Sequence, residues 1–365
     1  MSKLASDRVM VQRKRTRQVR VGNAAIGGGA PVSVQSMTKT NTADVAATLA
    51  QIKQLEEAGC EIVRVAVPDS QAVEALARIV RRCTLPVVAD IHFDYRLALA
   101  ALKAGVHKLR INPGNIGGPA RTKMLLREAK ARGVPVRIGV NAGSLEKDLY
   151  EQHGGATAEA LVASALRQAE LCQDVGFDDI VLSLKASDVL TTVKAYRLVA
   201  AQTDFPLHVG LTEAGTRWTG TIKSAVGIGI LLAEGIGDTI RVSLAGDPVE
   251  EVRVGWEILK SLGLRKRGVT LIVCPTCGRT QVDVVRIAEE LEQRLVGVDK
   301  ELTVAVMGCA VNGPGEAREA DVGVACGKHS ALLFRKGVVL GKIQESDVVD
   351  RLLKEVEAWP LGDKD

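Results

Sequence analysis

Aromatic residues and long apolar runs are both scarce in this chain of 365 residues. Phe, Trp and Tyr together make up 3% of it, whereas glycine occurs 36 times. A core with so few rings must be built from Val, Ile, Leu and Ala, which suits many short strands joined by tight turns. No apolar run approaches the roughly 18–20 residues that a membrane span needs, and no apolar segment near the start suits secretion. The sequence therefore predicts a cytoplasmic globular protein with no membrane partner.

A strong excess of one charge is absent as well. The formal net charge is +5, which favours an anionic small molecule or an acidic protein partner and gives no reason to expect nucleic acid. The first twenty residues are locally rich in Arg and Lys. Such a start is typical either of an organelle transit peptide or of a solvated arm, and we favour the arm.

Disulfides explain the cysteines poorly, because seven is an odd number and the chain is long. Cys60, Cys83 and Cys172 lie near the ends of helical patterns, and we expect them to be inert thiols. The other four come late in the chain, where metal binding is the better explanation.

Short β-rich runs alternate with amphipathic stretches over most of the chain. The strands are expected at residues 32–37, 62–67, 87–92, 108–113, 136–141, 180–185, 207–212 and 239–245. Helical patterns between them include residues 45–57, 72–82, 158–175 and 248–262. Eight even strand–helix units predict a (β/α)8 TIM-type barrel over residues 1–264. Residues 20–29 read as a hairpin that plugs the barrel floor.

A second domain is expected over residues 265–365. Its strands are predicted at 269–273, 302–307, 320–325 and 332–339, and its helices at 282–294 and 348–359. This pattern is typical of a small α+β domain.

Polar residues interrupt the predicted barrel strands, although parallel strands are normally apolar on both faces. Within a strand they are two or four positions apart and so share one face. Isolated buried ion pairs are one explanation, but cations on five strands have few acids to pair with, and an unpaired buried charge is costly. We therefore expect the cations Arg64, Arg110, Arg137, Lys185 and Arg241 to bind an anion with several phosphate oxygens.

Other polar residues on the same faces complete the predicted site. Asn141, Ser183 and Ser243 are candidate supporting donors, and His208 a further substrate-binding residue. Glu213, directly after the seventh strand, is the candidate acid/base, with His92 and His208 as weaker ones. The turn after the fourth strand, residues 112–118, could add backbone amides to a phosphate site.

The strongest chemical signal is the pair Cys274 and Cys277, followed by Cys309. A structural zinc would need a fourth ligand, for which Cys326 is the remaining thiol. A thioredoxin-like redox pair would explain Cys274 and Cys277 but would give Cys309 no role. An iron–sulfur cluster accepts one close pair plus distant cysteines. Spacing alone leaves these three alternatives open.

Residues 307–316, MGCAVNGPGE, resemble the cluster loop of the family of 4-hydroxy-3-methylbut-2-en-1-yl diphosphate synthases. The resemblance covers essentially the whole chain. It includes residues 34–38 (VQSMT), 63–68 (VRVAVP), 90–94 (DIHFD), 110–117 (RINPGNIG), 139–145 (GVNAGSL), 183–187 (SLKAS) and 210–215 (GLTEAG). Several motifs of this length make the resemblance specific, and the chain looks like the short bacterial form.

The resemblance implies a 4Fe–4S cluster ligated by Cys274, Cys277, Cys309 and the carboxylate of Glu316, with Cys326 as a bystander. Glu316 would then also take part in catalysis, since an oxygen ligand is easier to displace than a thiolate. The implied substrate is a cyclic diphosphate, 2-C-methyl-D-erythritol 2,4-cyclodiphosphate, reduced by electrons from an acidic flavodoxin or ferredoxin.

A head-to-tail homodimer follows from chain direction. The last barrel helix should end at the floor, about 20 Å from the catalytic mouth, and the cluster domain begins soon afterwards. A cluster placed over a partner's barrel would solve this problem, and the resemblance implies such a dimer too; a large hinge motion is the alternative. Two rival functions are a zinc-stabilised phosphosugar-binding protein and a pterin-binding barrel synthase.

Overall fold

The computed structural model describes residues 11–112, 116–309, 315 and 320–360. The chain divides into two compact units, Met1–Arg265 and Lys266–Asp365, one residue from the predicted boundary. In the first unit, eight parallel strands form one sheet in the order β8-β7-β6-β5-β4-β3-β10-β9. They are β3 (Ser33–Met37), β4 (Ile62–Ala66), β5 (Val87–Asp90), β6 (Lys108–Ile111), β7 (Val136–Asn141), β8 (Ile180–Lys185), β9 (His208–Val209) and β10 (Thr239–Ile240).

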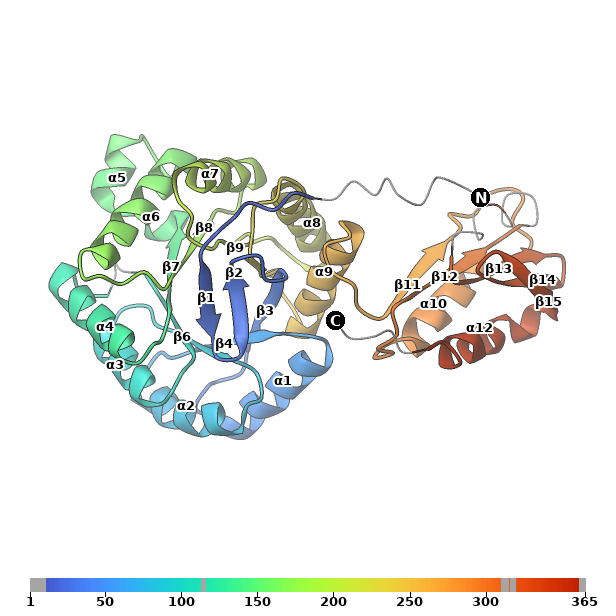
Figure 1. Ribbon diagram of the computed structural model, residues 1–365, viewed down its shortest axis with the longest axis horizontal. Helices are drawn as coiled ribbons and strands as arrows, with labels where there is room; N and C mark the ends of the chain where they lie inside the picture. The colour runs from blue at the N-terminus through green and yellow to red at the C-terminus, as the bar shows by residue number, and fades with distance from the viewer. Residues whose placement is uncertain (1–10, 113–115, 310–314, 316–319, 361–365) are drawn as a thin grey trace. The chain divides into compact units, whose positions relative to one another are not determined.

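The sheet closes into a barrel. The two strands at the ends of this order, β8 and β9, are joined by a parallel bridge between Leu182 and Leu207, and helices surround the ring of strands (Figure 1). These are α1 (Val45–Glu57), α2 (Ser70–Arg82), α3 (Tyr95–Lys103), α4 (Pro119–Ala131), α6 (Ala158–Gln173), α7 (Val189–Gln202), α8 (Arg217–Ala233) and α9 (Pro248–Ser261). The predicted TIM-type barrel is confirmed. None of the described helices combines the length and apolar character that a bilayer crossing requires.

Two predicted strands are much shorter than expected. Residues 207–212 and 239–245 were expected as strands, but regular pairing covers only His208–Val209 and Thr239–Ile240. Beyond these points the chain turns into the loops at the mouth, where Gly210 and Ser243 lie. A further short helix, α5 (Lys147–Gln152), follows β7 and was not predicted.

An antiparallel hairpin covers the barrel floor. Strands β1 (Gln18–Val21) and β2 (Ala24–Gly27) pair with each other and lie in front of the strand ring in Figure 1. Their buried Val21 and Ile26 pack against Ile62 and Val88, which are inward-facing residues near the amino ends of their strands. The predicted floor plug is confirmed.

The basic arm is not simply solvated, which corrects our expectation for its described part. Arg13 forms an ion pair with Asp238 at 3.1 Å, and Arg17 pairs with Asp204 at 2.8 Å. Arg17 also lies over the Phe205 ring, 4.6 Å from its centroid. These partners precede β9 and β10, so residues 13–17 bind the floor loops. Residues 1–10 lie outside the described part.

The second unit is one mixed sheet with helices on one face. Its strand order is β11-β12-β13-β14-β15, in which β11, β12 and β13 are parallel and the last two pairings are antiparallel. The elements are β11 (Val269–Val273), α10 (Val284–Arg294), β12 (Leu302–Met307), β13 (Val322–Gly327), β14 (Ser330–Arg335), β15 (Val338–Gln344) and α12 (Val348–Glu357). The single strand predicted over 332–339 is wrong, because Lys336 and Gly337 turn the chain with φ of 47° and 75°.

Candidate active site

The inward-facing side chains of the barrel form layers, each contributed by alternate strands, as is usual in this fold. The pairing registers stagger round the ring and so fix which residues share a layer. We name four layers from floor to mouth. The deep layer is Gln35, Val88, Arg137 and His208; the arginine layer is Arg64, Arg110, Ser183 and Arg241; the glycine layer is Met37, Asp90, Gly139 and Gly210; the upper layer is Ala66, Asn112, Lys185 and Ser243.

One carboxylate serves two cations of the arginine layer. Asp90 Oδ1 lies 3.0 Å from Arg110 Nη1, and its Oδ2 lies 3.7 Å from Arg64 Nε. Burial alone would raise the pKa of Asp90, but Arg64, His92 and Arg110 hold it well below its ordinary value. Burial also lowers the pKa of Arg64, to about 10. The explanation by buried ion pairs is thus correct for part of the site.

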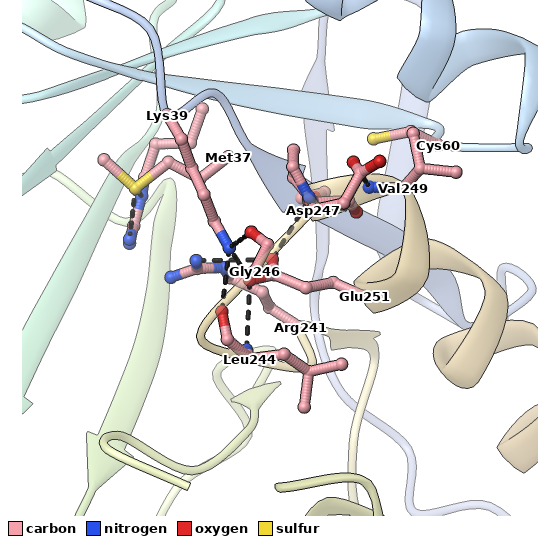
Figure 2. A network of polar contacts seen from close by, with 12 residues as sticks. Met37, Lys39, Cys60, Arg241, Leu244, Gly246, Asp247, Val249 and Glu251 are labelled. Atoms are coloured by element: carbon pink, nitrogen blue, oxygen red, sulfur yellow. Dashed lines mark hydrogen bonds and ion pairs between the residues drawn. The ribbon is translucent and has the colours of Figure 1, made fainter. Parts of the chain in front are cut away.

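The third arginine is held by a second buried carboxylate, from the helix that follows β10. Glu251 on α9 is 2% exposed, and its Oε2 lies 3.4 Å from Arg241 Nη2. Its other oxygen accepts a hydrogen bond from the Leu244 amide at 3.1 Å and pairs with Lys39 Nζ at 3.1 Å. Lys39 also donates to the Leu244 carbonyl at 2.7 Å. Figure 2 shows these side chains converging, so Glu251 fixes both Arg241 and the loop after it.

Two glycines lie directly above the arginine layer, where neighbouring groups approach the backbone closely. A Cβ added at Gly139 would lie 2.6 Å from Arg110 Nε, and one at Gly210 would lie 2.3 Å from the Arg241 carbonyl oxygen and 2.9 Å from Lys185 Nζ. A glycine inside a strand often marks a close approach by a ligand or by another part of the chain. At Gly139 the guanidinium of Arg110 leaves no room for a side chain, and at Gly210 the Arg241 backbone and the Lys185 ammonium leave none.

The predicted supporting donors lie around this space. Asn141 accepts a hydrogen bond from Arg110 Nη2 at 3.1 Å in the amide orientation that satisfies both of its ends. Ser183 donates to the Ile138 carbonyl at 3.4 Å, and Ser243 is half-buried in the upper layer. The pKa of Lys185 is lowered well below its usual value by burial, with Arg137 and Arg241 adding to the effect. The site is therefore strongly electropositive.

Two of the acid/base candidates, Glu213 and His92, differ in setting, and the third, His208, is fully buried. Glu213 is exposed at the mouth after β9 and has a left-handed φ of 52°, a conformation that is uncommon outside glycine. The His92 side chain is 52% exposed, and its Nε2 lies 3.2 Å from Asp90 Oδ2. Both side chains are thus on the mouth side of the arginine layer.

Arg137 and His208 lie lower than the other predicted site residues. They are 1% and 0% exposed, in the deep layer. Burial lowers the pKa of His208 well below its usual value, and Arg137 and Lys185 lower it further. The turn predicted to cradle a phosphate includes residues 113–115, which lie outside the described residues.

The cysteine motifs lie at the carboxyl ends of two neighbouring strands of the second sheet. Cys274 follows β11 and Cys309 follows β12, its parallel neighbour, and the Cys274 amide donates to the Val306 carbonyl at 3.0 Å. Cys277 is exposed, and its amide donates to Thr280 Oγ1 at 2.9 Å. Glu316 lies outside the described residues. Within the described part, no three Cys, His, Asp or Glu side chains lie close enough together to hold a single metal ion.

The remaining thiols have the expected inert settings. None of the seven cysteines, all of which lie in the described ranges, forms a disulfide. Burial raises the pKa of Cys60 and of Cys172 to about 12. Cys326 is buried in the core between the sheet and the two helices, and burial raises its pKa to about 11.

Sequence reasoning missed Gly139, Gly210 and Glu251 as site residues. The two glycines carried a usable signal, because each interrupts a run of predicted strand residues. Glu251 carried none that we can identify, since an acidic residue in the first turn of a helix is ordinary.

Comparison with known proteins covers both units. The model of the GcpE TIM-barrel domain matches residues 16–256, and that of the GcpE protein C-terminal domain matches residues 270–358. The chain is 60% identical over 343 residues to 4-hydroxy-3-methylbut-2-en-1-yl diphosphate synthase (flavodoxin) of Geobacter sulfurreducens, covering 94% of this chain and 97% of that protein. It is 58% identical over 348 residues to the protein of the same name from Aquifex aeolicus, covering 95% and 98% of the two chains.

The solved structures support the barrel alone. The 3-dehydroquinate dehydratase of Geobacillus kaustophilus aligns with a TM-score of 0.50 at 14% identity, over 68% of this chain and 99% of that one. At this identity the likeness extends to the fold and not to the chemistry.

Proposed function

This chain belongs to the family of 4-hydroxy-3-methylbut-2-en-1-yl diphosphate synthases, and from that premise we propose how its two units share the reaction. The protein is an oxidoreductase that converts 2-C-methyl-D-erythritol 2,4-cyclodiphosphate to 4-hydroxy-3-methylbut-2-enyl diphosphate in isoprenoid biosynthesis. The first unit binds the substrate, and the second carries the iron–sulfur cluster. Membership of this family sets aside the zinc-stabilised binding protein and the pterin-binding synthase.

The substrate diphosphate binds between the arginine layer and the upper layer. The observation that carries this proposal is the close approach of two cations to strand glycines, that of Arg110 to Gly139 and that of Lys185 to Gly210. Arg64, Arg110 and Arg241 contact the phosphate oxygens from below, in the forked geometry that guanidinium groups favour, and Arg137 reaches toward them from the deep layer. Asn141, Ser183 and Ser243 add neutral donors. His208, fully buried in the deep layer, shapes the site from beneath.

Glu213 supplies the proton for the hydroxyl group that leaves as water. It is exposed at the mouth, on the side from which the carbon skeleton of a substrate anchored by its diphosphate would project. His92, hydrogen-bonded to Asp90, is the second candidate for this proton transfer. Asp90 fixes the position of the imidazole, since it also contacts Arg110.

The cysteines at the carboxyl ends of β11 and β12 are suited to hold a 4Fe–4S cluster. Cys274 and Cys309 follow neighbouring parallel strands. Cys277 is exposed and lies three residues after Cys274, a spacing that cluster ligands use. We assign these three thiolates and the Glu316 carboxylate as ligands. The cluster, when bound, supplies single electrons and a Lewis-acidic iron. A flavodoxin or ferredoxin delivers the electrons, and the name of the relatives favours flavodoxin.

The substrate site is tested by replacing the lysine of the upper layer. Lys185→Ala should weaken substrate binding by roughly 2–3 kcal/mol, because a charge-assisted hydrogen bond to a phosphate oxygen is lost. The visible spectrum of the cluster should not change. Lys194→Ala, at a side chain that is 60% exposed on α7, is the matched control. Normal affinity in Lys185→Ala, measured by calorimetry, would move the diphosphate elsewhere.

The ligand set is tested by three replacements in anaerobically purified protein. Cys309→Ser should lose the absorption band near about 400 nm together with iron. Glu316→Gln should keep iron and lose most of the turnover, whereas Cys326→Ala should resemble the unaltered protein. A bleached Cys326→Ala, together with a fully active Glu316→Gln, would show that the fourth ligand is wrong.

A further inference from the structure

The barrel interior beneath the arginine layer is polar, where barrels of this fold are usually filled by bulky branched apolar side chains. The deep layer holds Gln35, Arg137 and His208. Directly below them, between this layer and the floor hairpin, the registers place the inward-facing Lys108 and Thr239. Each of these five side chains is 1% exposed or less.

Most polar atoms of this group have no hydrogen-bond partner among the residues that the structure describes. The unpartnered atoms are Lys108 Nζ, Nε and Nη1 of Arg137, both ring nitrogens of His208, both amide atoms of Gln35 and Thr239 Oγ1. Buried polar atoms are almost always bonded to protein, ordered water or an ion. Several unpartnered polar atoms in two adjoining layers therefore indicate one shared ligand rather than a poorly placed single side chain.

The charge of the group is uncompensated as well. Asp90 is engaged by Arg64, Arg110 and His92, and Glu251 by Lys39 and Arg241. Within the described ranges, neither Lys108 nor Arg137 has a carboxylate at ion-pair distance. Burial lowers the pKa of Lys108, and the positive charges of Arg137 and Arg64 lower it further. Since a guanidinium stays protonated in proteins, Arg137 at least retains a positive charge that water can solvate but not neutralise.

We propose that Lys108, Arg137 and His208 hold a small inorganic anion, such as chloride, in a second subsite that lies beneath the diphosphate site and adjoins it through Arg137. Lys108 Nζ and Arg137 Nε donate charge-assisted hydrogen bonds to the anion. His208 and the Gln35 amide nitrogen add neutral donors. The anion offsets the positive potential below the arginine layer and so keeps Lys108 and Arg137 from repelling each other.

Bromide is the probe for this subsite, because it replaces chloride and scatters X-rays anomalously. Crystals of the unaltered protein soaked in sodium bromide should show an anomalous peak in contact with Lys108 Nζ and Arg137. Lys108→Met should abolish the peak. Lys103→Met, at an exposed position in the last turn of α3, should retain it. Ordered water in place of bromide in the unaltered protein overturns the proposal, whether or not Lys108→Met folds.

Solution and substrate measurements exclude binding that occurs only in the crystal. Chloride is added stepwise in place of gluconate at constant ionic strength. The thermal midpoint of the unaltered protein and of Lys103→Met should rise with chloride concentration and then level off. That of Lys108→Met should not respond. Equal responses in all three proteins would contradict a specific subsite. Adding the cyclic diphosphate to the soak should leave the bromide peak in place; its displacement would mean that the deep layer belongs to the diphosphate site and would overturn a second subsite.

Discussion

Asp90 is the residue on which the geometry of the arginine layer depends most. Its two oxygens contact Arg110 and Arg64, and it also bonds His92. Arg64 and Arg110 come from β4 and β6, and His92 follows β5, so one carboxylate holds three side chains in a shared arrangement before any substrate arrives. If the carboxylate is removed, its buried cations lose their counter-charge. The free-energy cost of these unpaired buried charges is larger than the net stabilisation that the ion pairs provide.

Asp90→Asn should lower the free energy of unfolding of the barrel by about 3–5 kcal/mol near neutral pH. The folded-state pKa of Asp90 lies well below its ordinary value. Its stabilisation is therefore present above about pH 4 and is lost as the pH falls below that point. The difference between Asp90→Asn and the unaltered protein should accordingly shrink in acid, as measured by urea unfolding.

The control for this prediction is an exposed ion pair on the same unit. Asp174→Asn removes a carboxylate that is 61% exposed and lies 3.1 Å from Lys123. Its effect should stay within about 1 kcal/mol. If the penalty in Asp90→Asn were equally small, or did not change between neutral and acid pH, Asp90 would not hold the arginine layer as described.

At the scale of elements, the middle of β7 controls the space above Arg110. Gly139→Ala would place a methyl group 2.6 Å from Arg110 Nε, so the guanidinium must move out of its contact with Asp90. We expect at least a tenfold loss of substrate affinity, about 1.4 kcal/mol, with the cluster spectrum unaltered. Gly229→Ala on α8, where an added Cβ meets nothing within 4 Å, should bind substrate normally. Unchanged binding in Gly139→Ala would refute a tight fit at this strand.

The elements also show what the sequence could and could not predict. Helix α1 has the predicted bounds of 45–57. Its apolar spacing begins directly after Asp44, whose side chain caps the helix by accepting a hydrogen bond from the Ala47 amide. Strands β9 and β10 are shorter than predicted, since their polar residues continue an alternating pattern into loops that no longer pair. The break between β14 and β15 was missed because a Lys-Gly turn inside an apolar run is a weak signal beside the flanking valines.

The candidate site was predictable in its charges and not in its layering. Alternation within each strand correctly placed Arg64, Arg110 and Arg241 on the inner face. Which of them share a height depends on the stagger between strands, a property of the closed sheet that no single strand encodes. For the same reason, His208 and Arg137 could not be separated from the residues above them by sequence alone.

At the scale of the whole molecule, the path of the chain bears on how electrons reach the substrate. Helix α9 runs from the mouth toward the floor over 14 residues, about 20 Å at ~1.5 Å per residue. Arg265 then fixes the chain at the floor: its Nη1 donates to the Val32 carbonyl at 2.9 Å, and its Nη2 pairs with Glu61 at 3.1 Å. Both partners directly precede barrel strands. The first unit ends at Arg265, so the chain leaves the barrel at the end opposite the proposed diphosphate site.

We therefore propose a head-to-tail homodimer in which the cluster of one chain serves the barrel of the other. Closed two-fold pairs are the commonest oligomers, and such a pair needs no long linker. A hinge that carries the second unit of the same chain around the barrel is the alternative. The two predict different behaviour when defects in the two units are placed on different chains.

Mixing Arg137→Ala chains with Cys274→Ser chains distinguishes these arrangements, provided that subunits exchange. Each variant alone should be inactive, because the first lacks a diphosphate contact and the second a cluster ligand. In a trans arrangement the mixed dimer combines the intact barrel of the Cys274→Ser chain with the intact cluster of the Arg137→Ala chain, so one of its two sites works. Activity should then recover, up to half that of the unaltered dimer for each heterodimer formed. Differently tagged chains, purified through both tags in sequence, establish that heterodimers are present. Under the hinge arrangement every site uses one chain only, each chain carries a defect, and no activity returns however completely the subunits exchange.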